Sequence, residues 1–499
     1  MTRYKQKNKQ FVRHKIIRTA VEALTVHREN AACVRREYVR SICDEFTENS
    51  DCSRNKDEAS RIDKTYVVNW ESLHDSFIGK RDVRDLVVCY LCGPEPNNDF
   101  QEFVDLGILP QNIWAFESDK AAYAQAVDTY KAGEFPQPRI LKQNIDTFFR
   151  VTPKKFDIIY IDACGTVPSA QHSLKTISTM CLNSRLNSPG IIITNFSSPD
   201  LINEKDKIPE WSDLITLYRY FKEYSYDICL DEKGDILDQK YEDLKKEVCT
   251  DFRRSYGEFI SALLRDIPSV IIPIQRIDEN SYLKQFITSP VNHDYFELMR
   301  MAKGNSLASF FFYIAEQKRK NKLSERASML IGELGELKKI TDGFEWVLNL
   351  RNGRQELKED IKDILYYFET NNTVYQFLDK PHSNLVFDAI INQLIYPMHF
   401  NPEVNYRYFY KAKVREMYTD ISVFDECRYI YEWLPALHQL KSCFENVSWQ
   451  YVFRFSMDGL IRTRMNFNNE FFYQGAVLSH EEGLFAKSYI TDRKECVNF

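Results

Sequence analysis

The stretch Leu86-Val87-Val88-Cys89-Tyr90-Leu91 is a short apolar run that ends at the turn-forming residues Cys92-Gly93-Pro94-Glu95. Four similar runs follow it, and amphipathic stretches separate them, at 113–116, 139–141, 156–161 and 190–194. Short apolar runs that alternate with helical patterns are typical of βα units and a mostly parallel sheet. The sequence therefore predicts a doubly wound, Rossmann-like α/β domain.

Other segments of the chain extend this pattern. Helices are expected at 119–131 and at about 168–182, between apolar runs, and a charged helical insert is expected at 204–264. Two later apolar runs, 269–274 and 309–314, predict a further strand and a final strand.

At 499 residues the chain is too long for one ordinary domain. The pattern of apolar and charged residues changes at two places along it. Residues 82–318 carry the Rossmann-like pattern. Residues 1–81 predict a basic helical region with a polar linker at 45–65. Beyond a basic break, residues 323–499 predict a separate α-rich or α+β domain for recognition or assembly.

Composition narrows the class of protein. A hydrophobic content of 44% with 28% charged residues excludes wholesale disorder. No apolar run approaches the length of a membrane span, and the first residues do not resemble a secretory signal. The 12 cysteines are scattered, so we expect a reduced cytoplasmic protein, no metal site, and Cys89 and Cys92 as apolar strand residues.

The first forty residues are strongly basic, with 11 lysines and arginines against three glutamates. Apolar residues recur among them at helical spacing, which predicts a basic helical arm. One interpretation is contact with the phosphates of a nucleic acid, because clustered cations bind polyanions by releasing counterions. The other is a solvated helix face against an acidic surface of the same protein. The candidate nucleic-acid contacts are Lys5, Lys7, Lys9, Arg13, Lys15 and Arg18.

The loops after the predicted strands carry the candidate site residues, because doubly wound sheets bind ligands at the carboxyl ends of their strands. Glu117 ends the second strand, where a carboxylate accepts hydrogen bonds from the two ribose hydroxyls of a nucleoside cofactor. The candidate cofactor contacts are Gly93, Glu95, Glu117, Asn144, Asp146 and Asp162.

This order of residues resembles the class I S-adenosylmethionine-dependent methyltransferases. In that family a glycine loop follows strand one, a ribose-binding acid ends strand two, and an acid ends strand four beside the transferred methyl group. The resemblance implies S-adenosylmethionine as cofactor. The family's glycine-rich loop is reduced here to Gly93, followed by Pro94 and Pro96, so Glu95 or Asp99 would serve as the partner of the ammonium group.

The segment Asp162-Ala163-Cys164-Gly165-Thr166-Val167-Pro168 is similar to the Asp-Pro-aromatic-Gly-Ser/Thr-Pro motif of tRNA guanine-N2 dimethyltransferases, without its Pro and aromatic residue. The resemblance implies methyl transfer to nucleic acid, with RNA favoured over DNA. Asp162 would accept a hydrogen bond from the acceptor or act as general base. Cys164 is an alternative catalytic residue, as a covalent nucleophile.

A second hypothesis stays open beside this one. The chain could keep the methyltransferase fold without turnover and serve as a nucleotide-binding or regulatory subunit, with a protein partner bound through residues 323–499. The shortened glycine loop favours this hypothesis, and fold similarity alone does not decide function.

Overall fold

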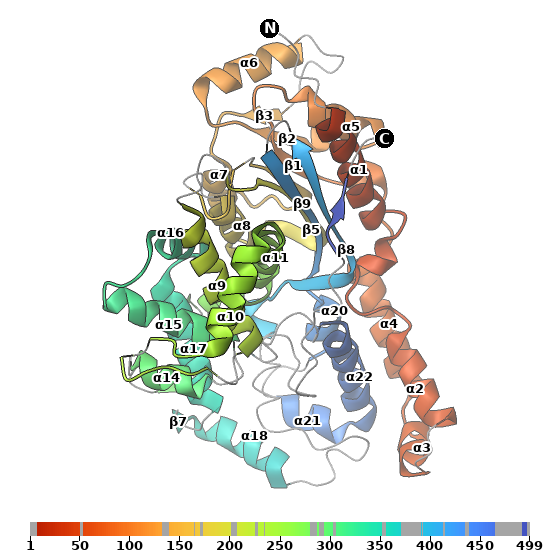
Figure 1. Cartoon of the computed structure of the whole chain (residues 1–499). Helices are drawn as coiled ribbons and strands as arrows, with labels where there is room; N and C mark the ends of the chain where they lie inside the picture. The colour runs from red at the N-terminus through yellow and green to blue at the C-terminus, as the bar shows by residue number, and fades with distance from the viewer. Residues whose placement is uncertain are drawn as a thin grey trace.

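The computed structural model describes residues 7–49, 53–131, 139–163, 165–169, 173–200, 207–224, 228–233, 235–279, 287–288, 294–302, 306–351, 356–370, 391, 393–412, 415–434, 439–464 and 492–496. A mixed sheet runs through it (Figure 1). Its strands, in spatial order, are β10 (Lys494–Glu495), β8 (His399–Ala412), β9 (Arg415–Asp425), β5 (Leu186–Ser197), β4 (Phe156–Asp162), β1 (Val88–Leu91), β2 (Ile113–Phe116) and β3 (Arg139–Leu141).

The first five strands are parallel and confirm the predicted doubly wound sheet. The helices that connect them lie on both faces: α5 (Asn97–Asp105), α6 (Lys120–Lys131), α7 (Ile145–Val151) and α8 (Ser173–Leu182). Val88 and Tyr90 pack on the face covered by α5 and α6, whereas Cys89 packs on the face covered by α7 and α8. A strand that is buried on both faces needs an apolar residue at every position, which explains the unbroken apolar runs.

Strands β8 and β9 form an antiparallel hairpin that extends the same sheet. β9 pairs with β5 over eight residues of each strand, from Gly190 opposite Phe424 to Ser197 opposite Met417. The prediction that 323–499 forms a separate domain is therefore wrong for these strands. They mix buried apolar and polar residues, a pattern that does not reveal which strand they pair with.

Two predicted strands are helical. Residues 269–274 span the end of a π-helical turn (Ile267–Ile271) and the start of α12 (Ile272–Glu279), and 309–314 lie within α15 (Ser306–Arg319). Both segments are buried, except that Tyr313 is half-buried. A helix that is buried on every side has the same unbroken apolar pattern as a buried strand, so periodicity could not separate the two.

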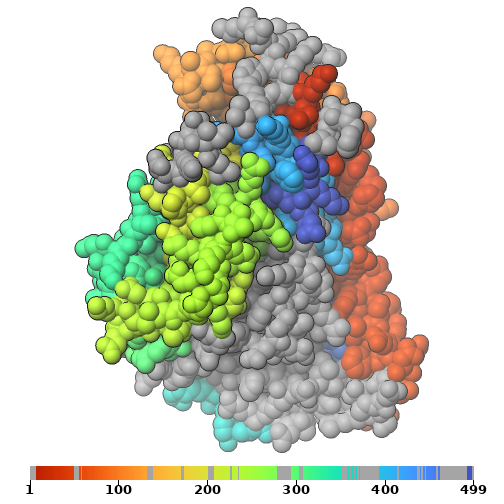
Figure 2. Space-filling view, viewed as in Figure 1, coloured from red at the N-terminus to blue at the C-terminus, as the bar shows by residue number. Residues whose placement is uncertain are grey.

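A helical layer covers one face of the sheet. The predicted insert at 204–264 contains α9 (Ile208–Tyr224), α10 (Gln239–Thr250) and α11 (Phe252–Asp266), and later helices join it: α14 (Tyr295–Met301), α16 (Glu325–Leu334), α17 (Leu337–Arg351) and α18 (Glu359–Thr370). Most of them share one large apolar core with the sheet. In Figure 2 the green helices of this layer and the red N-terminal helices form opposite margins of the molecule. The sequence pattern also predicts a helix at 384–396, and this segment lies largely outside the described residues.

The N-terminal region packs against the opposite face. In α1 (Lys7–Leu24), Val12, Ile16, Ile17 and Ala20 are buried against the sheet. The polar segment at 45–65 is mostly helical, because α2 (Tyr38–Glu48) and α3 (Ser53–Ser60) occupy it, so the predicted linker is wrong there.

Two further N-terminal elements complete this region. Helix α4 (Lys64–Ile78) shares a core with α20 (Arg428–Tyr431) and α22 (Val447–Arg464) from the other end of the chain. Within the described residues, no helix has both the length and the hydropathy that crossing a bilayer requires.

Candidate functional site

Two adjoining cavities lie at the carboxyl ends of the parallel strands, where doubly wound sheets bind ligands. Each has a volume of about 400 Å³. The β2 cavity is lined by Glu117 and the residues that follow β3, and the α1 cavity is lined by side chains of α1 and the loop after β1. Leu91, Gly93 and Asp162 line both cavities, so the two meet between the ends of β1 and β4.

Besides Gly93 and Asp162, the β2 cavity contains three further predicted cofactor contacts. Glu117 Oε1 accepts a hydrogen bond from the backbone N–H of Asp119 at 2.8 Å. Asn144 caps α7, because its Oδ1 accepts a hydrogen bond from the Asp146 N–H at 2.7 Å. Asp146 Oδ1 in turn accepts a hydrogen bond from the Thr176 hydroxyl at 2.5 Å. Two carboxylates are therefore held at fixed positions in a cavity that suits a ligand with hydroxyl and amine donors.

Gly93 forms the turn between β1 and the two cavities. Its φ is +57°, a conformation that glycine adopts without steric cost, and a Cβ atom there would have no neighbour within 4 Å. The positive φ of the turn, and not a lack of space for a side chain, thus explains why residue 93 is a glycine. The Cys92 N–H donates to the Phe116 carbonyl at 3.1 Å, which joins the ends of β1 and β2. Gly93 and Glu117 consequently line one cavity, as their spacing predicts.

The α1 cavity brings two cations and three acids together. Lys9 and Arg13 come from α1, Glu95 and Asp99 from the segment after β1, and Asp162 from the end of β4. Arg13 Nε lies 2.5 Å from Asp99 Oδ1, and Lys9 Nζ lies 2.8 Å from Asp162 Oδ2. Glu95 is exposed. A site with both signs of charge suits a zwitterionic ligand.

The ion pair of Arg13 and Asp99 is buried. Burial raises the pKa of Asp99 to about 6, although the Arg13 charge acts in the opposite direction. Burial lowers the pKa of Arg13, but Asp99, Tyr160 and Asp162 raise it more, and the net shift is upward. At pH 7 and above, both partners are therefore charged, and each compensates the other inside the protein.

The positions of the basic residues correct the prediction that α1 is a free arm. Arg13 is buried and paired with Asp99, so its assignment as a nucleic-acid contact is wrong. Lys9 lines the α1 cavity, and Lys15 Nζ lies 4.4 Å from the centre of the Tyr408 ring. Lys7 and Arg18 are exposed, whereas Lys5 lies outside the described residues. The apolar face of α1 is in the core. This arrangement is nearer to the second interpretation, in which the basic helix packs against an acidic surface of the same protein.

Asp162 is positioned by a chain of buried polar side chains. Asn195 lies opposite Asp162 on β5, and its Nδ2 donates to Asp162 Oδ1 at 2.8 Å. The same amide nitrogen lies 3.0 Å from the Tyr410 hydroxyl of β8, and Asn195 Oδ1 accepts a hydrogen bond from Thr419 of β9 at 2.8 Å. The hairpin from the end of the chain thus orients the acid that ends β4. No sequence signal connects Tyr410 or Thr419 with this site.

The loop after β4 is fixed at several points. The Ser197 N–H donates to the Gly165 carbonyl at 2.8 Å, and the Val167 N–H donates to the Tyr256 hydroxyl at 2.8 Å. Glu333 of α16 accepts hydrogen bonds from the N–H groups of Ser169 (2.8 Å) and Leu174 (3.0 Å). Cys164 lies outside the described residues.

Glu333 is a residue that sequence reasoning missed, and it makes stability depend on pH. Burial raises its pKa to about 7, from 4.5 in an exposed glutamate. The folded state therefore keeps a proton that the unfolded state loses between pH 4.5 and 7. This contribution to the free energy of unfolding is fully present below pH 4.5 and is lost as the pH rises through 7.

We expect Glu333→Gln to remove this dependence, which amounts to about 3 kcal/mol for a shift of this size. The measurement is urea unfolding at several pH values from 4.5 to 7.5. Glu336→Gln, on the exposed side of the neighbouring turn, is the matched control and should leave the wild-type slope unchanged. An unchanged slope in Glu333→Gln would contradict the assignment.

No protein-family model matches the sequence, and no curated protein matches it. Among solved structures, the chain is similar to magnesium protoporphyrin IX methyltransferase from Synechocystis PCC 6803 with bound SAM, at 15% identity over 33% of this chain and 77% of that one, with a TM-score of 0.18. It is also similar to a S-adenosylmethionine-dependent methyltransferase from Clostridium acetobutylicum ATCC 824, at 15% identity over 32% of this chain and 56% of that one, with a TM-score of 0.18.

A third similar structure is the plantazolicin methyltransferase BamL in complex with a substrate analogue and SAH, at 10% identity over 78% of this chain and 97% of that one, with a TM-score of 0.23. These TM-scores are low, so the assignment of the fold rests on this chain's own strand order and strand ends. By the order β3-β2-β1-β4-β5 and the placement of Gly93, Glu117 and Asp162 at its carboxyl edge, the chain has a doubly wound, Rossmann-like α/β fold.

Proposed function

We propose that this protein is an S-adenosylmethionine-dependent methyltransferase. The observation that carries the proposal is the pair of adjoining cavities, one with fixed carboxylates and one with both signs of charge, which meet at Gly93 and Asp162. An adenosyl group and a methionine zwitterion need these two environments side by side.

The β2 cavity would hold the adenosyl group. Glu117 uses Oε1 for the Asp119 N–H, and Oε2 makes no hydrogen bond to any other described residue, which leaves it available to ribose hydroxyls. Asn144 and Asp146, after β3, supply amide and carboxylate groups for the adenine amine.

The α1 cavity would hold the methionine moiety. Lys9 and Arg13 are the cations that would lie beside the carboxylate of the methionine moiety. Glu95 is an exposed acid that would lie beside its ammonium group. Charged side chains here would replace the backbone contacts that a glycine-rich loop gives. When bound, the sulfonium of the cofactor supplies an already activated methyl group, so the protein contributes mainly alignment.

Asp162 would handle the proton of the acceptor. It stands where the cavities meet, and Asn195 fixes its orientation. Its Oδ2 lies 2.8 Å from Lys9 Nζ, and a carboxylate at this place can accept a proton or a hydrogen bond. For an acceptor to reach Asp162 Oδ2, the Lys9 ammonium has to leave Asp162 and move toward the proposed position of the methionine carboxylate.

The acceptor is proposed to be a nucleic acid, with RNA favoured over DNA. The exposed cations Lys7 and Arg18 and the similarity of the Asp162–Pro168 segment to tRNA methyltransferases support this choice. Transfer of a labelled methyl group to total RNA, to DNA, or to neither distinguishes the classes of acceptor.

The second candidate is a regulatory protein that binds the nucleoside without turnover. The ion pair between Lys9 and Asp162 favours it, because the expected catalytic acid is already engaged. Its signature would be cofactor binding without methyl transfer to any acceptor, with residues 323–499 available to a protein partner.

We expect Glu117→Ala to weaken binding of S-adenosylmethionine by about 10- to 100-fold, because hydrogen bonds to a charged group contribute about 1.5 to 3 kcal/mol. Isothermal titration calorimetry measures this loss directly. Asp128→Ala, on the exposed face of α6, is the matched control and should bind like the wild type. If neither the wild type nor the control binds, the proposal fails for both the enzyme and the regulatory protein.

A further inference from the structure

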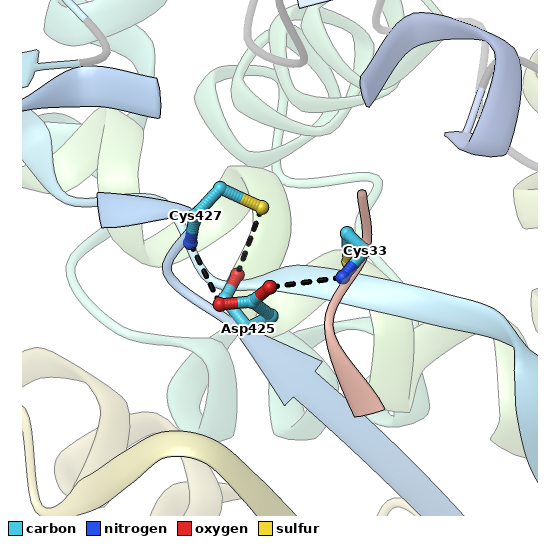
Figure 3. A group of neighbouring side chains, drawn as sticks. All are labelled: Cys33, Asp425 and Cys427. Carbon is cyan, nitrogen blue, oxygen red and sulfur yellow. Dashed lines mark hydrogen bonds between the residues drawn. The ribbon is translucent and has the colours of Figure 1, made fainter. Parts of the chain in front are cut away.

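A second group of chemically reactive side chains lies far from the two cavities. Cys33, Asp425 and Cys427 place their ligand-type atoms within 4.8 Å of one another, and all three residues are buried. β9 runs antiparallel to β5, and its end at Asp425 lies beside the start of β5. The group, which we call the thiol–carboxylate cluster, therefore sits at the edge of the sheet opposite the cavities (Figure 3).

Asp425 organises the two cysteines through their backbones. Its Oδ2 accepts a hydrogen bond from the Cys33 N–H at 2.9 Å, and its Oδ1 accepts one from the Cys427 N–H at 2.9 Å. In Figure 3 these bonds run from the carboxylate to both cysteines. Ser188 and Tyr429 donate to the same carboxylate at 2.9 and 2.7 Å. The carboxylate is thus fixed, and it fixes the Cα positions of both thiols.

The backbone at Cys427 is itself unusual. Its φ is +49° and its ψ is 39°, the left-handed region that residues other than glycine rarely adopt. Such conformations cost about 1 to 3 kcal/mol and are concentrated at functional sites. Here the left-handed turn lies beside Cys33, and the two Sγ atoms lie within 4.8 Å of each other.

The thiols have only weak partners in this arrangement. Cys33 Sγ lies 3.6 Å from the His399 carbonyl, and Cys427 Sγ lies 3.8 Å from the Asp425 carbonyl. Burial raises the pKa of Cys427 well above its usual range, with the contact to Cys33 and the Asp425 charge adding to the shift.

We propose that Cys33, Asp425 and Cys427 form a structural binding site for one thiophilic d¹⁰ cation, with Zn²⁺ as the ion that fits the donor set. Two thiolates and a carboxylate are ligands that zinc prefers, at about 2.0 to 2.3 Å. Binding replaces one proton on each cysteine, so that two protons leave and two Zn–S bonds form. Three ligand atoms within 4.8 Å need only a small contraction to surround such an ion.

The neighbouring side chains can adjust to the ion. Tyr429 Oη lies 2.7 Å from Asp425 Oδ2 and 3.8 Å from Cys427 Sγ, so its hydrogen bond can pass to the sulfur and leave a lone pair of Asp425 Oδ2 for the cation. His399 is the cross-strand partner of Asp425, and its side chain leaves the same face of the sheet. Its ring nitrogens are not among the ligand atoms that lie within 4.8 Å of one another, so a water molecule would complete the coordination of the ion.

Such an ion would tie together two parts of the chain that are distant in sequence. Cys33 and Asp425 are 392 residues apart, and Cys33 follows the helix that forms the wall of the α1 cavity. The scattered cysteines give no zinc-binding spacing, because the ligands come from segments that only the fold brings together.

The test uses the full chain, purified after expression with Zn²⁺ and dialysed against metal-free buffer. We expect about one zinc ion per chain by mass spectrometry, and less than a tenth of that in Cys33→Ser and Cys427→Ser. Cys443→Ser is the matched control, because Cys443 is an equally buried cysteine outside the cluster, and it should keep its zinc. Zinc that persists in both cluster variants, or wild-type protein without zinc, would overturn the proposal.

A second measurement avoids substitution, since a buried variant can lose its fold. Wild-type protein stripped with a chelator is titrated with Co²⁺, and a thiolate-to-cobalt charge-transfer band in the near ultraviolet is expected, with two thiols protected from a thiol reagent. Absence of the band in protein that keeps its far-ultraviolet circular dichroism would refute the site. Neither readout depends on methyl transfer.

Discussion

Replacing Asp162 by asparagine should lower the rate of methyl transfer by about 10²- to 10⁴-fold, the usual contribution of a positioned acid or base. Asparagine has nearly the same shape and can still accept a hydrogen bond from Asn195, but it cannot take a proton or carry charge. Affinity for S-adenosylmethionine should change little, because the ribose contact that we propose for Glu117 is untouched. Single-turnover methyl transfer and calorimetry on the same protein measure the two effects separately.

The control for this experiment is Asp128→Asn, an exposed aspartate on α6 that should keep full activity. Equal rates for Asp162→Asn and the wild type would exclude Asp162 as the group that handles the proton. If wild-type protein binds the cofactor but transfers methyl groups to no acceptor, the regulatory candidate is favoured.

Replacing Arg13 by methionine should lower the free energy of unfolding by about 3 to 5 kcal/mol at pH 7.5, because it leaves Asp99 buried without its partner. The loss should shrink at pH 5. Asp99 already has a pKa raised to about 6 by burial, and without Arg13 it binds a proton more readily and avoids the buried charge. Urea unfolding at the two pH values measures the difference.

Two variants sharpen this test. His14→Ala, the neighbouring residue whose partner Glu102 is at the surface, should cost about 1 kcal/mol or less, as exposed pairs do. The double variant Arg13→Met, Asp99→Leu should recover most of the lost stability. Equal destabilisation by Arg13→Met at both pH values would mean that packing, and not charge, is responsible.

The sequence predicted the part of the fold that depends on local patterns. The five parallel strands were found because a strand buried on both faces is apolar at every position, as at 156–161. The same rule failed at 309–314, where α15 is buried on every side. The hairpin at 399–425 was assigned to another domain, since alternation shows that a strand exists but not which strand it joins.

The site was predicted to a similar degree. Gly93 and Glu117 line one cavity because the length of a βαβ unit fixes which strand ends lie side by side. The cations of α1 were predicted to face outward, and Arg13 does not, because only the tertiary fold brings Asp99 beside it. Glu333 and Tyr410 act on the site from far along the chain, and nothing near them in sequence marks that role.

The position of β9 has a consequence for how the protein is made. β5 pairs with β9, which lies more than 200 residues later in the chain. A ribosome therefore releases β5 long before its partner strand. Until β9 is made, β5 is an edge strand with unpaired backbone N–H and C=O groups, and another extended segment could pair with them. Asn195 therefore receives its Thr419 partner only after residues made late in synthesis are released, and premature release would yield aggregation-prone fragments.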